Sequence, residues 1–210
     1  MNYINDYEKL GETGKYKKYI LMSKSPRRRD LLSFLKPEID SIRIDERAIE
    51  KICMEKYKDC DFLERASKTC AEIAKAKSDV DLVKDCLYIS SDTMVIMDDI
   101  IYGKPRDVAE AREMFMSYFG KSHYVVTGVC LRSENYMEVF YSIAEVRFTD
   151  YYKALDDVID EYLKGENVMD KAGAYGIQDL DPRLISYING DINTIIGLPV
   201  SEVSRRILGE

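Results

Sequence analysis

The 210-residue sequence has a single histidine and five cysteines, and no two of the cysteines form a CxxC pair. The spacing of zinc ligands is therefore absent, and an odd number of scattered cysteines is typical of reduced thiols rather than of a disulfide framework. His123 has neither a second histidine nor a cysteine pair near it in the sequence, so we interpret it as a structural residue. The same isolation argues against a catalytic triad with a nucleophilic serine.

Other absences narrow the class of protein further. The chain contains no GxxxxGK[ST] loop, GxGxxG fingerprint, GxSxG elbow or HExxH pair, which excludes the common NTPase, dehydrogenase, serine-hydrolase and zinc-peptidase sites. No apolar run approaches the roughly 18 residues of a membrane span, and residues 1–18 lack the apolar centre of a signal peptide. We therefore expect a cytoplasmic protein without a membrane partner. We also expect residues 1–18 to be a loosely attached extension and residues 19–210 to form a single domain.

The composition is that of an ordinary globular protein, with 46% apolar and 33% charged residues. The net charge of −7 argues against a nucleic-acid partner, because such binding is driven by basic surface. An acidic protein with a local cluster of arginines is better suited to binding a small anion in a defined pocket.

Such a cluster lies in the segment from Ser23 to Leu32, which contains three consecutive arginines. The apolar residues 19–22 predict a short buried strand, after which Ser25 and Pro26 suit the N-cap and first position of a helix. A helix N-terminus presents free backbone N–H groups, and the forked donors of Arg27–Arg29 match phosphate oxygens. The pattern favours a phosphate site, and a solvated basic helix face is the alternative.

The order of predicted elements indicates an α/β protein with several antiparallel neighbours, hence a mixed sheet. We expect helices at residues 62–76, 108–119 with Asp107 as cap, 151–164 with Asp150 as cap, and from 199 onward. We expect strands at residues 39–44, 86–97, 124–131 and 138–148, and a hairpin in which Asn189-Gly190 joins strands 183–188 and 192–196.

Asp92 lies between apolar residues of a predicted strand, where a carboxylate is rarely found without a purpose. It can hold a divalent metal or accept a proton from an attacking water, or it can simply bond backbone N–H groups at a strand end. Lys104, in the turn Gly103-Lys104-Pro105, can bring an ammonium toward Asp92. Asp45 and Glu46 can add carboxylates for a metal. Solvated surface positions are the alternative for all three.

A third segment of interest covers residues 170–178, in which small residues let the backbone approach a ligand closely. Tyr175 offers an aromatic face there, and the Gln178 amide both donates and accepts, as recognition of a base edge requires. An ordinary tight loop is the alternative.

Taken together, these motifs resemble the Maf family of nucleoside triphosphate pyrophosphatases. The resemblance covers roughly residues 19–207 and rests on several motifs in the family's order. These are Ser23-Lys24-Ser25-Pro26-Arg27-Arg28, Ser91-Asp92-Thr93, Gly103-Lys104-Pro105-Arg106-Asp107, Thr127-Gly128-Val129, Lys171-Ala172-Gly173-Ala174-Tyr175-Gly176-Ile177-Gln178 and Ile196-Gly197-Leu198-Pro199.

The resemblance implies hydrolysis of a nucleoside triphosphate between its α and β phosphates, with Mg²⁺ or Mn²⁺ as cofactor. It also implies a curved mixed sheet flanked by helices, with two lobes around a central cleft as in inosine triphosphate pyrophosphatase-like proteins, and a homodimer. The implied residues fall into two groups. Those that act on the reacting phosphate are Asp92 as proton acceptor, Lys104, and Glu46 with Asp92 at the metal; those that bind substrate are Ser23, Arg27, Arg28, Thr93, Tyr175 and Gln178.

The form of residues 172–178 resembles the dTTP/UTP branch of the family rather than the methyl-GTP branch, and Arg27, Thr93 and Gln178 match positions associated with substrate choice. Modified pyrimidine triphosphates are then further candidate substrates. Two alternatives stay open: the same hydrolysis of a purine or methylated nucleotide, and a nucleotide-responsive binding protein that influences cell division.

The sequence departs from the family pattern in three places. Thr69-Cys70 stands where we align a Lys-Ala pair of the family, with Lys68 as the nearest lysine. Glu166-Asn167 replaces a Glu-Pro, and Asp179 replaces a glycine after Gln178, which adds a negative charge near the expected base pocket.

Overall fold

Three long antiparallel strands form the centre of the fold: β4 (Cys86–Met97), β6 (Ser122–Ser133) and β7 (Tyr136–Phe148). They are rich in β-branched and aromatic residues and are buried along most of their length on both faces. The computed structural model describes residues 3–165 and 168–209. The strands predicted at residues 86–97, 124–131 and 138–148 are confirmed.

The remaining strands complete an eight-stranded sheet in the order β1-β7-β6-β4-β2-β3, with β5 on β4 and β8 on β7. Because β2 runs parallel to both β3 and β4, the sheet is mixed, as predicted. These strands are β1 (Ile4–Leu10), β2 (Lys18–Leu21), β3 (Glu38–Ile39), β5 (Ile100–Tyr102) and β8 (Ile185–Asn189).

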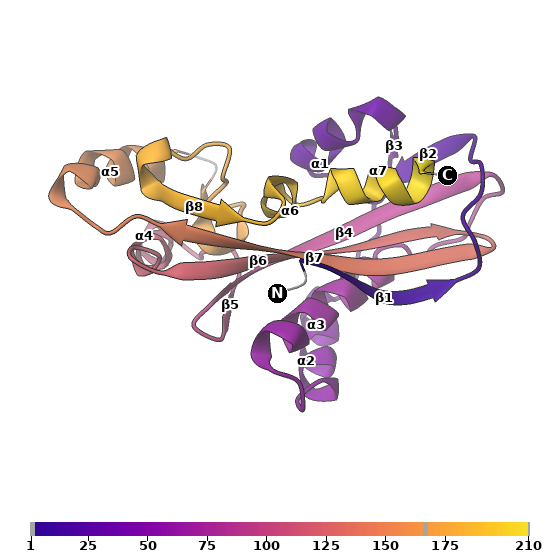
Figure 1. Ribbon diagram of the computed structural model, residues 1–210, viewed down its shortest axis with the longest axis horizontal. Helices are drawn as coiled ribbons and strands as arrows, with labels where there is room; N and C mark the ends of the chain where they lie inside the picture. The colour runs from indigo at the N-terminus through magenta and orange to yellow at the C-terminus, as the bar shows by residue number, and fades with distance from the viewer. Residues whose placement is uncertain (1–2, 166–167, 210) are drawn as a thin grey trace.

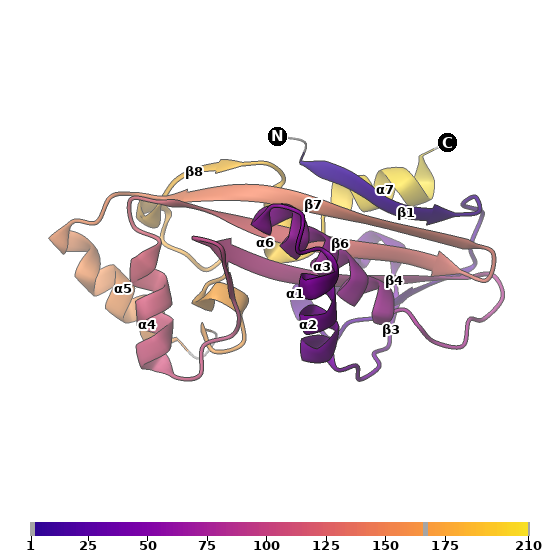
Figure 2. The ribbon, with the colours of Figure 1, turned by 90° about the horizontal axis from the view of Figure 1, so that it is seen from below.

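Helices cover the sheet in two groups (Figure 1). Helices α2 and α3 lie on one face and α1, α6 and α7 on the other, while α4 and α5 pack together at one end of the molecule (Figure 2). The α4–α5 end and the end bearing α1–α3 are the two lobes. The helices are α1 (Pro26–Leu31), α2 (Glu46–Lys56), α3 (Phe62–Ala76), α4 (Val108–Ser117), α5 (Asp156–Lys164), α6 (Ile192–Ile196) and α7 (Val200–Leu208).

Helix α3 packs unusually close to the sheet. Its predicted apolar face is confirmed, since Ala66, Cys70, Ile73 and Ala74 are all buried. A Cβ atom on Gly128 of β6 would lie only 2.6 Å from the Cys70 carbonyl oxygen, so this contact requires glycine. Gly128 is also the register partner of Asp92 in β4, which fixes the height of α3 relative to that carboxylate.

The lobe at the other end has a core of aromatic side chains. Phe115 and Tyr118 from α4 and its C-cap pack against Phe148 of β7, and Leu155 and Ile159 close this core from the α5 side. Residues 171–178 run over this core, so its aromatic side chains support the segment that the sequence predicts to bind a base.

Residues 4–10 form β1, which pairs antiparallel with β7. Two ion pairs fasten this strand: Asp6 with Arg206 of α7 at 2.5 Å, and Glu8 with Lys75 of α3 at 2.5 Å. The expectation of a loose attachment is therefore wrong for this strand. A domain boundary after residue 18 stays a prediction.

Side-chain caps explain two differences from the predicted elements. Residues 192–196 form α6 rather than the second strand of a hairpin, because the Asp191 carboxylate accepts the Asn193 N–H (2.9 Å) and begins a helix directly after β8. Residues 39–44 do not form a strand beyond Ile39, and α2 follows them after Asp45, whose carboxylate accepts the Ala48 N–H (3.1 Å).

The caps predicted for the two middle helices differ in outcome. Asp107 caps α4 as expected, since its carboxylate accepts the Glu110 N–H at 2.8 Å. Asp150 does not cap α5, which begins at Asp156 after a 3₁₀ turn at Lys153–Leu155. Within the described residues, every helix is too short or too polar to span a bilayer.

Candidate active site

A cleft of ≈ 690 Å³ opens between the two lobes, over β4 and β5. It brings together segments that are far apart in the sequence: the start of α1, the start of α2, the middle of β4, the turn before α4 and the loop at residues 170–178. Its walls include the following predicted site residues: Arg27, Arg28, Glu46, Asp92, Thr93, Lys104, Tyr175 and Gln178. Ser23 joins them through Arg28, whose Nη1 donates to the Ser23 Oγ at 3.3 Å. All nine therefore gather at one place, and their individual roles stay predictions.

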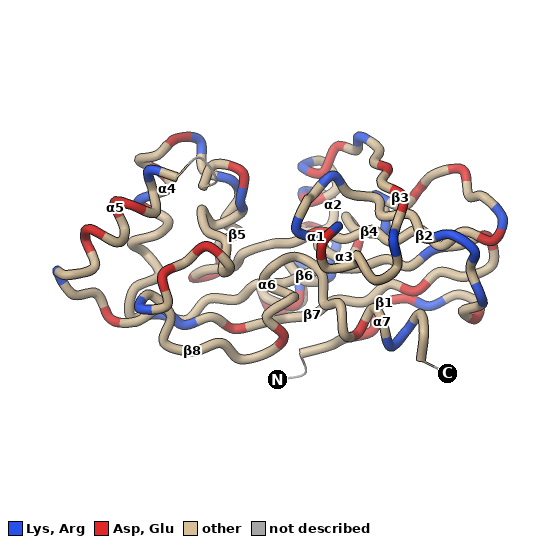
Figure 3. Tube along the Cα trace, turned by 90° about the horizontal axis from the view of Figure 1, so that it is seen from above, with Lys and Arg blue, Asp and Glu red and all other residues tan. Residues whose placement is uncertain are grey.

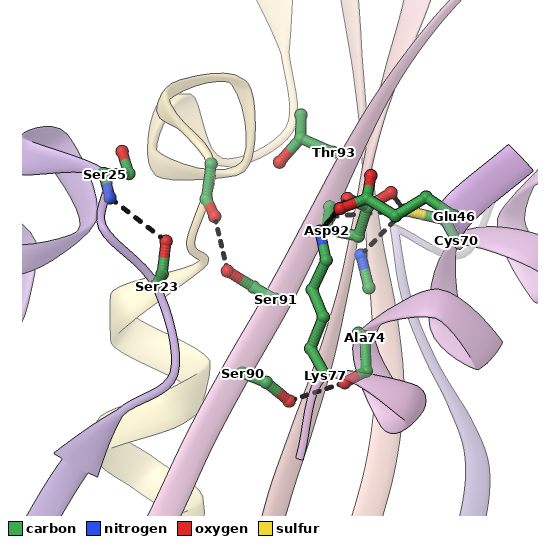
Figure 4. Close-up of polar contacts among 12 residues, drawn as sticks. Ser23, Ser25, Glu46, Cys70, Ala74, Lys77, Ser90, Ser91, Asp92 and Thr93 are labelled. Carbon is green, nitrogen blue, oxygen red and sulfur yellow. Dashed lines mark hydrogen bonds and ion pairs between the residues drawn. The ribbon is translucent and has the colours of Figure 1, made fainter. Parts of the chain in front are cut away.

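Lys77 links the two predicted acidic residues. Its Nζ lies 2.7 Å from Asp92 Oδ1 and 3.1 Å from Glu46 Oε1, and Figure 4 shows the lysine side chain reaching up between them. The Lys77 and Asp92 side chains are only 16% and 12% exposed, so this contact is weakly screened by water, whereas the Glu46 side chain is 53% exposed. Lys77 was not predicted because it follows the last residue of α3, where a solvated lysine is common.

The departure at Thr69-Cys70 leaves the cleft with a lysine from elsewhere on the chain. Thr69 is buried and donates its hydroxyl to the Arg65 carbonyl oxygen at 2.8 Å. Lys68 forms an ion pair with Glu64 at 2.7 Å on α3 itself, so it does not serve the cleft. The lysine that faces the carboxylates of Asp92 and Glu46 is Lys77, two turns further along.

Asp92 contacts Cys70, a residue of α3 that is fully buried. The Cys70 Sγ lies 3.2 Å from the Asp92 carbonyl oxygen and 3.8 Å from its Oδ2, and it accepts the Gly128 N–H at 3.3 Å. Burial, and then the charge of Asp92, raise the pKa of the thiol well above its ordinary value, so Cys70 stays protonated as a donor. Nearby, Ser91 donates to the Gly197 carbonyl oxygen at 3.2 Å, which ties β4 to α6 (Figure 4).

Arg28 joins three segments around the cleft. Besides Ser23, its guanidinium donates to the Gly197 carbonyl oxygen (2.9 Å) and to the Thr93 Oγ1 (3.0 Å). A Cβ on Gly197, whose φ is +121°, would lie 3.2 Å from the Arg28 Nε, so a side chain there would crowd the guanidinium. Burial lowers the pKa of Arg28 somewhat while the charge of Asp92 opposes that shift, and the group stays positive.

The three consecutive arginines point to different places. Arg27 and Arg28 line the cleft, whereas Arg29 is exposed and lies 3.7 Å from Asp30. The Ser25 side chain makes no capping bond, although Ser25 is the N-cap residue and Pro26 is the first residue of α1. Figure 3 shows basic and acidic residues interspersed over the lobe that carries α1, α2 and β3, and the cleft is lined by Arg27 and Arg28 from α1 and by Glu46 from α2. The cleft thus has cationic and anionic walls.

The loop at residues 171–178 forms the wall opposite α1. The Gly173 N–H donates to the Gly103 carbonyl oxygen at 3.0 Å, which joins the loop to the turn that carries Lys104. Asp179 lies 3.6 Å from the buried Lys171 ammonium, so its negative charge is balanced beside the predicted base pocket. The departure at Glu166-Asn167 lies outside the described residues.

Glu50, one turn after Glu46 on α2, also lines the cleft and was not predicted. Burial, and then the charge of Asp92, raise the pKa of its carboxyl. In the part of the chain that the structure describes, no three His, Cys, Asp or Glu side chains are grouped as a metal site. The carboxylates of Asp92 and Glu46 nevertheless converge on one ammonium, so their oxygens are close enough to share a cation with added ligands.

A second hollow, of ≈ 800 Å³, lies beside β1 and α2. Its lysines are already paired with carboxylates, Lys56 with Glu72 at 3.0 Å and Lys75 with Glu8 at 2.5 Å. It therefore lacks the convergence of cations that distinguishes the central cleft as the candidate active site.

Comparisons with known proteins find similarity along almost the whole chain. The family model for Maf-like proteins matches residues 18–209. A relative from Thermosipho africanus is 37% identical over 89% of this chain and 90% of its own length. One from Thermotoga maritima is 37% identical over 88% of this chain and 85% of its own length, and one from Pyrococcus furiosus is 37% identical over 91% and 94%. All three relatives are named dTTP/UTP pyrophosphatase.

Proposed function

Because this chain belongs to the Maf family, we propose that it is a hydrolase that converts dTTP and UTP to the nucleoside monophosphate and pyrophosphate. The observation that carries the proposal is the convergence of Arg27, Arg28 and Lys104 with the carboxylate of Asp92 in one cleft. A triphosphate brings several negative charges that would repel an isolated carboxylate. Cations on the facing wall remove that repulsion and stabilise the charge that develops during phosphoryl transfer.

Asp92 is the proposed proton acceptor. A water oxygen attacks the α-phosphorus, its proton passes to the Asp92 carboxylate, and the bond between the α-phosphorus and the bridging oxygen breaks as pyrophosphate leaves. Lys77 and Cys70 hold Asp92 from two sides, so the carboxylate keeps one orientation at the base of the cleft. Lys104 lines the same cleft and is proposed to stabilise phosphate charge.

A divalent cation, Mg²⁺ or Mn²⁺, is part of this proposal. Asp92 and Glu46 are the residues that would hold it, since both carboxylates already face one positive charge, that of Lys77. Such an ion supplies charge neutralisation for the phosphates and orients the attacking water. The ordering of Asp92 by Lys77 and Cys70 does not depend on the ion.

Base recognition is assigned to the loop opposite α1. The exposed Gln178 amide can donate to one edge atom of a pyrimidine and accept from another, and Tyr175 supports the loop from beneath. Thr93 acts through its neighbours: its hydroxyl accepts from Arg28 and contacts the Thr127 hydroxyl at 2.9 Å. We therefore assign Thr93 to the orientation of the Arg28 guanidinium.

The test is pyrophosphate release across dTTP, UTP, dCTP, dATP, GTP and methylated nucleotides with Mg²⁺ or Mn²⁺. We expect dTTP and UTP to be preferred, and Gln178→Ala to reduce that preference. Hydrolysis in H₂¹⁸O should place the label in the monophosphate, because water attacks the α-phosphorus. Label in pyrophosphate would contradict the mechanism, and turnover confined to purines would contradict the assignment of the base pocket.

A nucleotide-responsive binding role in cell division is the alternative from another class. It would give tight nucleotide binding without turnover, unaffected by Asp92→Asn. The placement of Asp92 between Lys77 and Cys70 favours catalysis, because binding alone does not require an oriented carboxylate beside phosphates. The homodimer and the cytoplasmic location stay predictions.

A further inference from the structure

The only histidine of the chain forms a buried hydrogen bond with the loop proposed to recognise the base. His123 in β6 is 1% exposed, and its Nε2 lies 2.6 Å from the hydroxyl of Tyr175, which is 5% exposed. The His123 ring also packs against the ring of Tyr118, with the ring centroids 4.2 Å apart and the planes tilted by 35°. This bond joins the central sheet directly to residues 171–178.

The imidazole is neutral in this setting. Burial lowers the pKa of His123 to about 3, and its Nδ1 has no hydrogen-bond partner among the residues that the structure describes. The bond joins Nε2 and the Tyr175 hydroxyl, and which of the two groups donates depends on which ring nitrogen carries the proton. The interaction is thus a single directional bond rather than an ion pair.

Two other tyrosines fasten the same loop. The Tyr118 hydroxyl donates to the Gly173 carbonyl oxygen at 3.0 Å, and the Tyr162 hydroxyl of α5 accepts the Gly176 N–H at 2.9 Å. The bonds from Tyr118, His123 and Tyr162 thus reach the loop at residues 173, 175 and 176. Gln178, which lies two residues past the last of these, is itself exposed. Its position is set by how firmly the preceding residues are held.

We propose that His123 is a positioning residue for base recognition: by holding the Tyr175 hydroxyl it sets the position of residues 176–178 and hence the discrimination among bases. This inference rests on the proposed function and deepens it, since it assigns selectivity to a residue outside the cleft walls. It differs from a purely structural role, which would affect all substrates equally.

The test compares kcat and KM for the nucleotide panel in the wild type, His123→Phe, Tyr175→Phe and the double variant. In each single variant, one buried polar partner is left unpaired. We expect KM for the preferred nucleotide to rise about tenfold, equivalent to about 1.4 kcal/mol, with kcat within about twofold and the preference over other bases reduced by a similar factor. In the double variant neither partner is left unpaired, so part of the preference should return.

His123→Gln keeps a side-chain donor and should retain more of the preference than His123→Phe. Tyr88→Phe is the matched control: it removes a buried tyrosine hydroxyl, one that accepts the Val83 N–H at 3.2 Å, away from the loop, and should leave the preference unchanged. Circular dichroism establishes that each variant is folded. If His123→Phe does not fold, Tyr175→Phe and His123→Gln carry the comparison.

The inference is overturned if folded single variants keep the wild-type preference among bases. It is also overturned if the factor by which the double variant loses that preference equals the product of the factors for the two single variants. If the wild type hydrolyses no nucleotide, the proposed function fails and the inference falls with it. An active wild type with unchanged variants overturns the inference alone.

Discussion

Acidification is expected to destabilise this protein through His123. The imidazole is buried among the rings of Tyr118, Phe148 and Tyr175, and its pKa in the folded state is lowered to about 3 by burial. The perturbation is a change from pH 7.5 to pH 5.0, across the ordinary histidine pKa of 6.5. Because the chain has no other histidine, a single side chain carries the histidine contribution.

The direction in which stability changes with pH follows from proton binding. Below pH 6.5 the imidazole of the unfolded chain takes up a proton, whereas the folded protein keeps it neutral down to about pH 3. The unfolded state therefore binds more protons in this window, and stability falls as pH falls. At 1.36 kcal/mol for each pH unit, the 1.5 units between 6.5 and 5.0 amount to about 2 kcal/mol of lost stability.

Urea unfolding of the wild type and His123→Phe at both pH values measures this term. The free energy of unfolding falls by about 2 kcal/mol for each M of urea, so between pH 7.5 and pH 5.0 the urea midpoint of the wild type should fall by about 1 M more than that of the variant. The variant should start lower at pH 7.5, since it leaves the Tyr175 hydroxyl unpaired, but its stability should change less with pH. Contributions from carboxyl groups are common to both proteins and cancel. Equal acid sensitivity in the two proteins would refute the reasoning.

Three further predictions concern packing and charge. Lys77→Met should lower kcat at least about 100-fold, because it removes the ammonium beside the carboxylate that we propose as the proton acceptor. Lys75→Met on the same turn should leave kcat unchanged, and pyrophosphate release measures both variants. Gly128→Ala should lower the free energy of unfolding by about 3 kcal/mol or more, since its Cβ would lie 2.6 Å from the Cys70 carbonyl oxygen. Urea unfolding measures this loss, and an unchanged urea midpoint would contradict that packing. Arg206→Met should lower the free energy of unfolding by about 3 kcal/mol, because it leaves the Glu138 carboxylate without the arginine, whose side chain is 6% exposed. Thermal or urea unfolding measures this loss, and a loss below about 1 kcal/mol would show that water reaches the ion pair.

Elements with a strong local pattern could be predicted from the sequence. The bounds predicted for β4 and α3 match the structure because each has a strong local signal of its own type. In Cys86–Met97, apolar β-formers stand on both sides of the polar residues 90–93, and Phe62–Ala76 has a helical apolar face. The gathering of Ser23, Asp92 and Gln178 was implied by the resemblance rather than by any pattern in the sequence. The shape of the cleft confirms only that these residues lie together.

What could not be predicted depended on tertiary contacts or on competing local signals. Asn189-Gly190 favours a hairpin, but the Asp191 cap starts a helix before a second strand can form. In the sequence, Lys77 has the pattern of a solvated lysine at a helix end, and only the tertiary structure brings its ammonium to Asp92 and Glu46. His123 was interpreted as a structural residue and is buried, yet its link to Tyr175 joins residues 52 positions apart and has no local signature.

The most direct test of the central claim compares the wild type with Asp92→Asn and with a matched control, Asp99→Asn. Asp99 lies in the exposed turn after β4 at φ 58°, a conformation that asparagine also tolerates. Pyrophosphate release from dTTP with Mg²⁺ and nucleotide binding by calorimetry are measured on all three proteins. We predict that Asp92→Asn loses turnover at least about 1,000-fold while still binding nucleotide, and that Asp99→Asn resembles the wild type. Turnover by Asp92→Asn within about tenfold of the wild type would contradict the assignment of Asp92 as the proton acceptor.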